Sequence, residues 1–332
     1  MKQLKFSIAI PTYNGSEWIV ETLESILSQG FQNYEIVISD DCSTDDTLDV
    51  IKSFDEPRIK IFQNKENLGY GKNLKTLKNR ISGDVLFLMG QDDLLLKGAL
   101  EKTHSAFFLE DNIGVVTRPY YWFDDDPGTP VRAVRPYSKE LDSVMSVQDG
   151  REEVQKIFES VGQLSGLAYR VEYMERNFHE HCFPSHIYPF AEITKRHKVA
   201  FLKDYTVAVR IASSQTRFKS SIYDISPTKT WVKMFETVYA GNEYENVRDW
   251  GIEQVATNFV GLVQLKNYST FKNLIREIAF LVKIRPQNLL NFKFWFFSLG
   301  VIVMPRSFLI PMVDMYKNTI NSCTLTDIEI NL

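Results

Sequence analysis

The sequence predicts an α/β protein with a mostly parallel sheet, followed by a helical C-terminal region. From residue 6 to about residue 211, short β-rich runs alternate with helical stretches. Right-handed crossovers between parallel strands produce this order. After about residue 217 the alternation stops and long helical patterns follow. A length of 332 residues suits two domains, and we expect them over residues 1–217 and 218–332.

Each strand is expected where a short apolar run lies between polar residues. The run at 35–39 is almost continuously apolar, which is typical of a strand that is buried on both faces. The run at 84–89 is the most apolar of all. The expected strands, in chain order, are 6–10, 35–39, 58–62, 84–89 and 113–117.

Helices are expected between these strands because apolar residues recur there at helical spacing. In the first of them Ile19, Leu23 and Ile26 share one face, and Ser16 is a plausible N-cap. Residues 118–149 are rich in aromatic residues, Arg and Pro, and we expect a long irregular loop with a functional role. The helices of the first domain are expected at 17–29, 44–53, 71–80 and 95–109.

The C-terminal region is expected to contain helices at 228–239, 248–263, 268–282 and 288–303. The apolar run 294–304 is shorter than the roughly 20 residues that a membrane-spanning helix needs. Two interpretations remain open for this run. It packs on the first domain, or it lies in a membrane interface with Lys293 and Arg306 at the headgroups.

The composition excludes several classes of protein. Apolar residues make up 44% of the chain and charged residues 24%, so intrinsic disorder is excluded. The net charge of −4 disfavours binding to nucleic acid, which usually requires a basic surface. Cys42, Cys182 and Cys323 are far apart in the sequence, which fits a reducing, cytoplasmic compartment. The first ten residues are too short and interrupted for a signal peptide and suit a strand.

Polar residues cluster directly after three of the expected strands, at 11–14, 40–46 and 90–93. In open α/β sheets ligands bind beyond the carboxyl ends of the strands. After the second strand, we expect one of Asp40 and Asp41 to face the ligand. Asp45 and Asp46 suit the positive end of the following helix.

Two further features point to a phosphorylated ligand. Asp92 and Asp93 follow the most apolar strand, where they could hold Mg²⁺ or Mn²⁺ together with a diphosphate, or Asp93 could cap a helix. The segment from Asn67 to Asn73 contains two glycines that allow a tight turn. Lys72 in this segment could reach a phosphate.

The order of these motifs resembles the inverting family 2 glycosyltransferases of the GT-A fold. The resemblance is carried by Pro11-Thr-Tyr-Asn-Gly15, by Asp40-Asp41 with Ser43-Thr-Asp-Asp-Thr47, by Asn67-x-Gly69 and by Asp92-Asp93. It implies that a nucleotide-diphospho-sugar is the donor, that Mn²⁺ or Mg²⁺ is the cofactor, and that Asp92 and Asp93 bind the metal. It also implies a nucleotide site made of Pro11, Thr12, Tyr13, Asp41, Lys72 and Asp92.

The resemblance fails at the expected general base. The family usually has an Asp near 185–187, where this chain has no carboxylate. His186 has a suitable ordinary pKa and is the first candidate base. Glu192 is the second, and Glu180, His179 and His181 are nearby alternatives. The family motif also has an acidic residue at the position of Gly90.

The acceptor is expected to be a saccharide. The resemblance places Ser165 and Gly166 near it, and the aromatic rings of Tyr121 and Trp122 suit a sugar. We expect a lipid-linked surface polysaccharide such as an O-antigen, with the chain at the cytoplasmic face of the inner membrane. A non-catalytic nucleotide-sugar-binding or scaffold protein is the alternative. A nucleotidylyltransferase is disfavoured because the first turn lacks a basic residue.

Overall fold

The computed structural model describes residues 3–181, 183–212, 224–319, 325, 328 and 330. The chain divides into a first compact unit of residues 1–181, 185–213 and 323–332 and a second unit of residues 182–184 and 214–322. The expected boundary after residue 217 lies outside the described residues, as do Cys182 and Cys323.

The first unit is built around an eight-stranded sheet in the order β3-β2-β1-β4-β10-β6-β11-β9. Strand β1 runs parallel to β2 and β4, whereas β10 is antiparallel to both of its neighbours. The sheet is therefore mixed, with a parallel N-terminal half as expected. In sheet order the strands are Ile59–Gln63, Tyr34–Asp40, Phe6–Thr12, Val85–Leu88, Ala168–Arg170, Ile113–Thr117, Lys198–Phe201 and Ser143–Met145.

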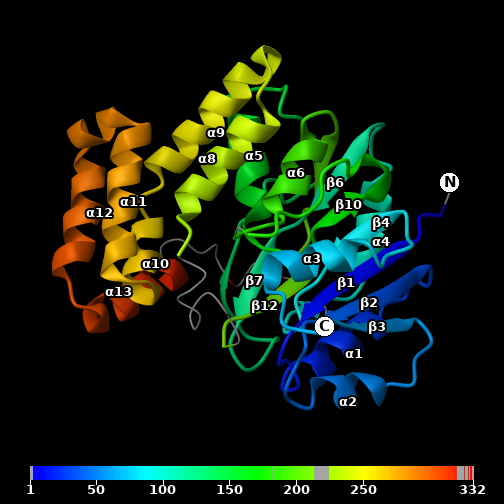
Figure 1. Cartoon of the computed structure of the whole chain (residues 1–332). Coiled ribbons are helices and arrows are strands. Elements are labelled where there is room, and N and C mark those ends of the chain that lie inside the picture. The colour runs from blue at the N-terminus through cyan, green and yellow to red at the C-terminus, as the bar shows by residue number, and fades with distance from the viewer. Residues whose placement is uncertain are drawn as a thin grey trace. The chain divides into compact units, whose positions relative to one another are not determined.

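Helices cover both faces of the parallel half of this sheet (Figure 1). Ile19, Leu23 and Ile26 of α1 are fully buried in one core with Phe6 and Ile8 of β1. Helix α3 packs on β1 and β2, on the side away from α1 in Figure 1. The helices of this unit are α1 Ile19–Leu27, α2 Thr47–Lys52, α3 Tyr70–Lys78, α4 Ala99–Ala106, α5 Arg151–Glu159 and α6 Ile187–Thr194.

A second, four-stranded sheet corrects the expectation for residues 118–149. It has the order β5-β12-β7-β8, and β7 and β8 form an antiparallel pair within the segment expected to be irregular. All four residues of β7 are aromatic, and both of its faces are packed: Tyr121 and Phe123 lie in one hydrophobic core and Tyr120 in another. The strands are β5 Leu94–Leu95, β7 Tyr120–Phe123, β8 Pro130–Ala133 and β12 Val207–Arg210.

The helix starts in the first unit also differ from the prediction, most clearly at α1 and α4. Ser16 does not cap α1, because its hydroxyl donates a hydrogen bond of 2.8 Å to Asp45 instead. Helix α4 begins at Ala99 after Gly98, four residues later than expected, because Leu94 and Leu95 form β5. The alternative role of Asp93 as a helix cap is therefore wrong.

The described part of the second unit is helical, as expected. Phe259, Leu274 and Phe294 are among the residues of its core. Helix α13 is not among the expected helices, and Pro311 lies inside it. None of the described helices has the length and apolar character needed to cross a membrane. The helices are α8 Pro227–Val238, α9 Glu245–Thr257, α10 Gly261–Tyr268, α11 Phe271–Ile284, α12 Phe292–Val303 and α13 Arg306–Thr319.

Candidate functional site

The turns after β1 and β4 are joined by the side chain of Gln91. Its Oε1 accepts a hydrogen bond of 2.9 Å from the backbone N–H of Tyr13, and its Nε2 donates one of 3.2 Å to the Tyr13 carbonyl. A Cβ at Gly15 would lie 2.5 Å from the Gln91 carboxamide, so glycine is needed for this close approach. The structure thereby brings the Pro11-Thr12-Tyr13 segment beside Gln91, the residue before Asp92. Sequence analysis did not single out Gln91.

The turns after β1 and β2 are also tied together. Asn14 has a left-handed backbone, with φ of 48°, and its Oδ1 accepts a hydrogen bond of 2.8 Å from the N–H of Thr44. The N–H of Asn14 donates to Ser43, and that of Gly15 to Thr47. These bonds fix both turns as one rigid rim at the carboxyl ends of the strands.

Asp40 and Asp41 have different partners, although both are buried. Asp40 accepts hydrogen bonds from the N–H and the hydroxyl of Ser43, at 3.0 and 2.5 Å, so it holds its own turn. Asp41 accepts from the N–H groups of Leu68 and Gly69, at 2.9 and 2.8 Å. The Asp41 carboxylate therefore anchors the glycine loop that leads into α3, where Lys72 is half-buried.

Asp93 lies beneath this rim and is 4% exposed. Its Oδ2 accepts hydrogen bonds from Ser165 at 2.5 Å and from Gln163 at 2.8 Å, and its Oδ1 accepts one of 3.0 Å from the N–H of Arg210. Burial, together with the neighbouring charge of Asp92, raises the pKa of Asp93 to about 7. Asp92 is half-buried, so it is the more accessible carboxylate of the pair.

Carboxylate oxygens are suitable ligands for a divalent metal ion, but this site contains few of them. Within the described residues no group of three or more His, Cys, Asp or Glu side chains could hold a metal ion. Mg²⁺ and Mn²⁺ prefer oxygen ligands and are often bound by one or two carboxylates plus substrate phosphates. Asp92 meets that requirement. Asp93 would have to exchange its present hydrogen bonds.

A buried arginine of the aromatic segment, Arg118, lies against Gly166, one of the predicted acceptor residues. Arg118 is 4% exposed, and its Nε has no hydrogen-bond partner in the described structure. Burial lowers its pKa to about 10. Gly166 has a φ of +83°, and a Cβ there would collide with the Arg118 side chain. Ser165 and Gly166 thus connect Arg118 with Asp93 and contribute to the floor of the site.

His186 is buried, contrary to what a base at the acceptor requires. Its side chain is 3% exposed, at the N-terminus of α6. The ring contacts the Tyr70 hydroxyl through Nδ1 at 3.0 Å and the Val161 carbonyl through Nε2 at 2.9 Å. Burial lowers its pKa to about 4, so the ring is neutral near pH 7. Glu192 is also shielded, because it forms an ion pair of 3.2 Å with Arg176.

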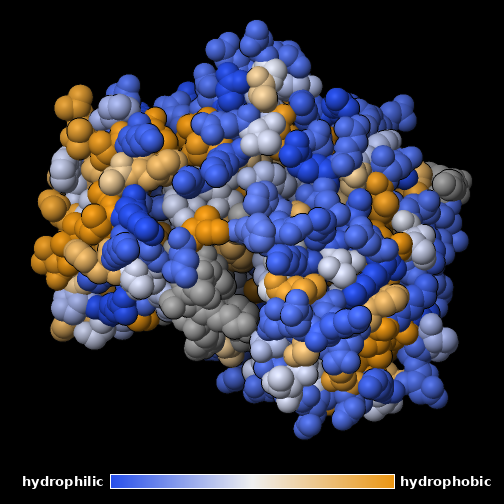
Figure 2. All heavy atoms as spheres, in the orientation of Figure 1, coloured by the Kyte–Doolittle hydropathy of each residue, from blue (hydrophilic) through white to orange (hydrophobic). Residues whose placement is uncertain are grey.

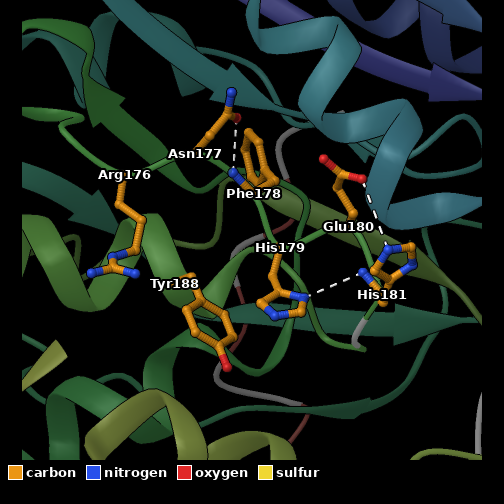
Figure 3. Close-up of a pocket in the computed structure, with 7 residues that line it drawn as sticks. All are labelled: Arg176, Asn177, Phe178, His179, Glu180, His181 and Tyr188. Carbon is orange, nitrogen blue, oxygen red and sulfur yellow. Dashed lines mark hydrogen bonds and ion pairs between the residues drawn. The ribbon is translucent and has the colours of Figure 1, made fainter. Parts of the chain in front are cut away.

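The other three candidate bases line an open hollow of about 410 Å³ (Figure 3). His179 lies between Tyr188 and His181 in this view, with its ring centroid 4.9 Å from that of Tyr188. Glu180 forms an ion pair with Lys75 of α3, which lowers the pKa of its carboxyl. The hollow is lined by Arg176, Asn177, Phe178, His179, Glu180, His181 and Tyr188.

The hollow adjoins the start of α3. A Cβ at Gly71 would lie 2.6 Å from the carbonyl oxygens of both His179 and Glu180. The loop that lines the hollow therefore packs directly on the helix that carries Lys72. Aromatic rings beside amide, guanidinium and carboxylate groups are a suitable surface for a sugar.

The two aromatic acceptor candidates are neighbours in β7, so their side chains lie on opposite faces of the strand. Tyr121 is fully buried, and its hydroxyl donates a hydrogen bond of 2.8 Å to the Pro127 carbonyl. Trp122 is half-buried, and the Arg132 guanidinium lies 4.4 Å from its ring centroid. Of the two rings, only that of Trp122 is partly accessible at a face of the second sheet.

Comparison with known proteins finds similar sequences for the first part of the chain. Residues 7–160 match the model of glycosyl transferase family 2. A stretch of 109 residues is 37% identical to the putative glycosyltransferase EpsE of Bacillus subtilis, covering 32% of this chain and 38% of that protein. A stretch of 99 residues is 36% identical to a GalNAc(5)-diNAcBac-PP-undecaprenol beta-1,3-glucosyltransferase of Campylobacter jejuni, covering 29% and 32%. The chain thus spans only about a third of the length of either relative.

Solved structures extend the similarity of fold over most of the chain. TarS residues 1–349 of Staphylococcus aureus, in complex with UDP-GlcNAc, superpose with a TM-score of 0.63 at 16% identity, covering 94% of this chain and 91% of that one. A mannosyltransferase of Pyrobaculum calidifontis, in complex with GDP-Man and Mn²⁺, gives a TM-score of 0.54 at 15% identity, covering 91% and 87%. The chain has the GT-A fold, and its residues 7–160 resemble glycosyl transferase family 2.

Proposed function

We propose that this chain is a glycosyltransferase that moves a sugar from a nucleotide-diphospho-sugar to an acceptor hydroxyl with inversion. One observation carries the proposal. The turn after β1, the Asp41-anchored loop and the Asp92-Asp93 pair meet at the carboxyl ends of parallel strands. That edge of an α/β sheet is where such ligands bind, and it lies within the family 2 region.

Asp92 is our proposed metal ligand, and Mn²⁺ or Mg²⁺ the metal. When bound, such an ion would neutralise the charge that develops on the diphosphate leaving group. The chain's own residues have separate tasks. Tyr13 and Asp41 would contact the nucleoside, Lys72 would pair with a phosphate, and Asp93 would hold the loop in place through Ser165.

The general base is proposed to come from the hollow. A base must accept a proton from the acceptor hydroxyl on the side opposite the leaving group. Glu180 lies at an open surface and is ionised near neutral pH, although its ion pair with Lys75 would have to open. Both ring nitrogens of His186 already have partners inside the fold. Glu192 remains a candidate if its ion pair with Arg176 opens.

The acceptor is proposed to be a growing surface polysaccharide, such as an O-antigen, carried on a lipid. Support comes from the Campylobacter relative, whose name describes an undecaprenol-linked saccharide as its acceptor. Trp122 and the hollow would contact the sugar chain. The reaction would then take place at the cytoplasmic face of the membrane.

A calorimetric titration with UDP, GDP, CDP and dTDP, with and without Mn²⁺, tests the donor site. We expect one diphosphate to bind, more tightly with metal, and binding to fall at least tenfold in Asp92→Asn. The control is Asp111→Asn, which changes an exposed carboxylate in the loop before β6. Binding of none of the four by a cooperatively folding protein would overturn the proposal.

The base is tested in variants that still bind the donor. We expect Glu180→Gln to abolish transfer, and His186→Gln and Glu192→Gln to retain it. A protein that binds the diphosphate and yet neither hydrolyses nor transfers the sugar would instead be the non-catalytic binding protein.

A further inference from the structure

Helix α12 is apolar on every side and yet half exposed. Its sequence from Phe292 to Val303 contains a single charged residue, Lys293. Phe294, Ser298 and Val301 are buried in the core of the second unit, and this accounts for one side of the helix. A helix that is apolar all round is normally buried in a protein core or a membrane.

The exposed residues of α12 recur at helical spacing and form a continuous face. Phe292 is 81% exposed, Phe296 65%, Leu299 53% and Val303 79%. Leu290 precedes the helix at 91% and Phe308 of α13 follows at 67%. We call these six residues the apolar face. Figure 2 shows hydrophobic side chains gathered at the edge where Figure 1 places α12.

The charges in the sequence around the apolar face are mostly basic, between Glu253, which forms an ion pair with Arg285, and Asp314. Residues 254–313 contain seven Lys and Arg residues and a single acidic residue, Glu277. Glu277 is 2% exposed, whereas Lys272, Lys283, Lys293 and Arg306 are exposed. This part of the chain therefore presents a basic surface, although the chain as a whole has a net charge of −4.

We propose that the apolar face docks on the surface of an anionic lipid bilayer, with its aromatic side chains among the acyl chains and its lysines at the headgroups. Apolar and aromatic side chains beside a basic rim are typical of interfacial helices. The twelve residues of α12 extend about 18 Å, which is too short for a hydrocarbon core of about 30 Å. The helix would therefore lie in the interface and not cross it.

A second copy of the chain is a poorer occupant for this face. In a two-fold dimer the same patch meets itself, which would bring the basic rims of both copies together. Like charges across such an interface are destabilising. Anionic headgroups neutralise the rim, and each basic residue near such a surface adds to the attraction.

The inference deepens the proposed function, because a lipid-linked acceptor lies at a membrane. It rests on the proposed function only for the reason why the chain would dock on a membrane. Membrane docking is measured without nucleotide or acceptor, so its failure is distinguishable from the failure of donor binding.

The test is flotation of the full chain with vesicles of phosphatidylcholine alone or mixed with phosphatidylglycerol. We expect binding to the mixed vesicles, weakened by high salt. Phe292→Asp should reduce the partition coefficient roughly tenfold or more, since a buried Phe side chain contributes about that factor. Leu141→Asp is the matched control, because Leu141 is 73% exposed in the first unit. This variant should bind the vesicles like the wild type.

Thermal melting and sedimentation velocity complete the test. Phe292→Asp should melt at the wild-type temperature, because the substituted side chain packs little; if it does not, Phe296→Asp replaces it. The inference would be overturned if the wild type bound neutral and anionic vesicles equally, or if Phe292→Asp bound as well as the wild type. The inference would also be overturned if the wild type formed a dimer without lipid and Phe292→Asp dissociated that dimer. The apolar face would then be an interface between copies.

Discussion

The Tyr70 hydroxyl and Nδ1 of His186 are hydrogen-bonded at 3.0 Å, although 116 positions separate the two residues. Nε2 of the same ring lies 2.9 Å from the Val161 carbonyl. A carbonyl can only accept, so Nε2 carries the proton and Nδ1 accepts from Tyr70. The contact joins the first residue of α3, beside the predicted nucleotide site, to the N-terminus of α6.

A double-mutant cycle measures this contact. We expect Tyr70→Phe to lower the free energy of unfolding by about 1 kcal/mol, the usual net contribution of one hydrogen bond. His186→Gln should cost more, because the Val161 carbonyl also loses its partner. Urea denaturation of both single variants and the double variant should give a coupling of about 0.5–1.5 kcal/mol. Strictly additive effects would show that the two side chains do not interact in solution.

The same histidine predicts a pH dependence of stability. Its pKa is about 4 in the folded protein because of burial, against an ordinary value of 6.5. The unfolded chain therefore binds the proton more readily, and stability is complete above pH 6.5 and falls as the pH drops toward 4. The loss is on the order of 3 kcal/mol. It should appear as the difference between wild type and His186→Gln in denaturation curves across this range.

The position of His186 shows what the sequence can and cannot predict here. The strand ends that carry Tyr13, Asp41 and Asp92 were predictable, because apolar runs and turn residues are local signals. The burial of His186 was not, since it depends on Tyr70 and Val161, which lie far away in the chain. A motif gives an order of residues, whereas a hydrogen bond between distant segments requires the packed fold.

Errors in the predicted elements have similar causes. Residues 118–149 contain Pro and Gly at the turns between β7, β8 and β9, and these turn signals hid short strands that pair with distant partners. Pro311 lies inside α13, although a proline inside a helix normally costs about 3 kcal/mol. Pairing and packing across the fold outweighed both local signals.

Glu35 on β2 provides a second pH-dependent contribution to stability. Its side chain is 3% exposed and accepts hydrogen bonds of 2.6 Å from Lys60 and from Ser7. Burial alone would raise the pKa of Glu35, but the bonds from Lys60, Ser7 and Ser82 outweigh it and lower the pKa to about 2. The stabilisation is therefore present above pH 4.5 and is lost as the pH falls toward 2.

Glu35→Gln tests this contribution, which is on the order of 3 kcal/mol. The variant should be less stable than the wild type at pH 7, and the difference should shrink as the pH falls below 4.5. Thermal melting at a series of pH values measures it. A difference that stays constant with pH would mean that the carboxylate charge is not the stabilising feature.

Gly166 and Gly69 form a matched pair for the effect of a methyl group at positive φ. Both have a φ of +83°, which side chains rarely adopt, so alanine at either position strains the backbone by about 1–3 kcal/mol. At Gly69 nothing lies within 4 Å of an added Cβ, whereas at Gly166 the Cβ would collide with Arg118 and lie 2.7 Å from Val207.

We expect Gly69→Ala to fold and to lose only the stability that the backbone strain costs, measured by urea denaturation. Gly166→Ala should lose clearly more stability, and its diphosphate binding should weaken because Ser165 moves away from Asp93. Equal stability of the two variants would show that Arg118 is free to move away from Gly166, and the floor of the site would then be less rigid than these contacts indicate.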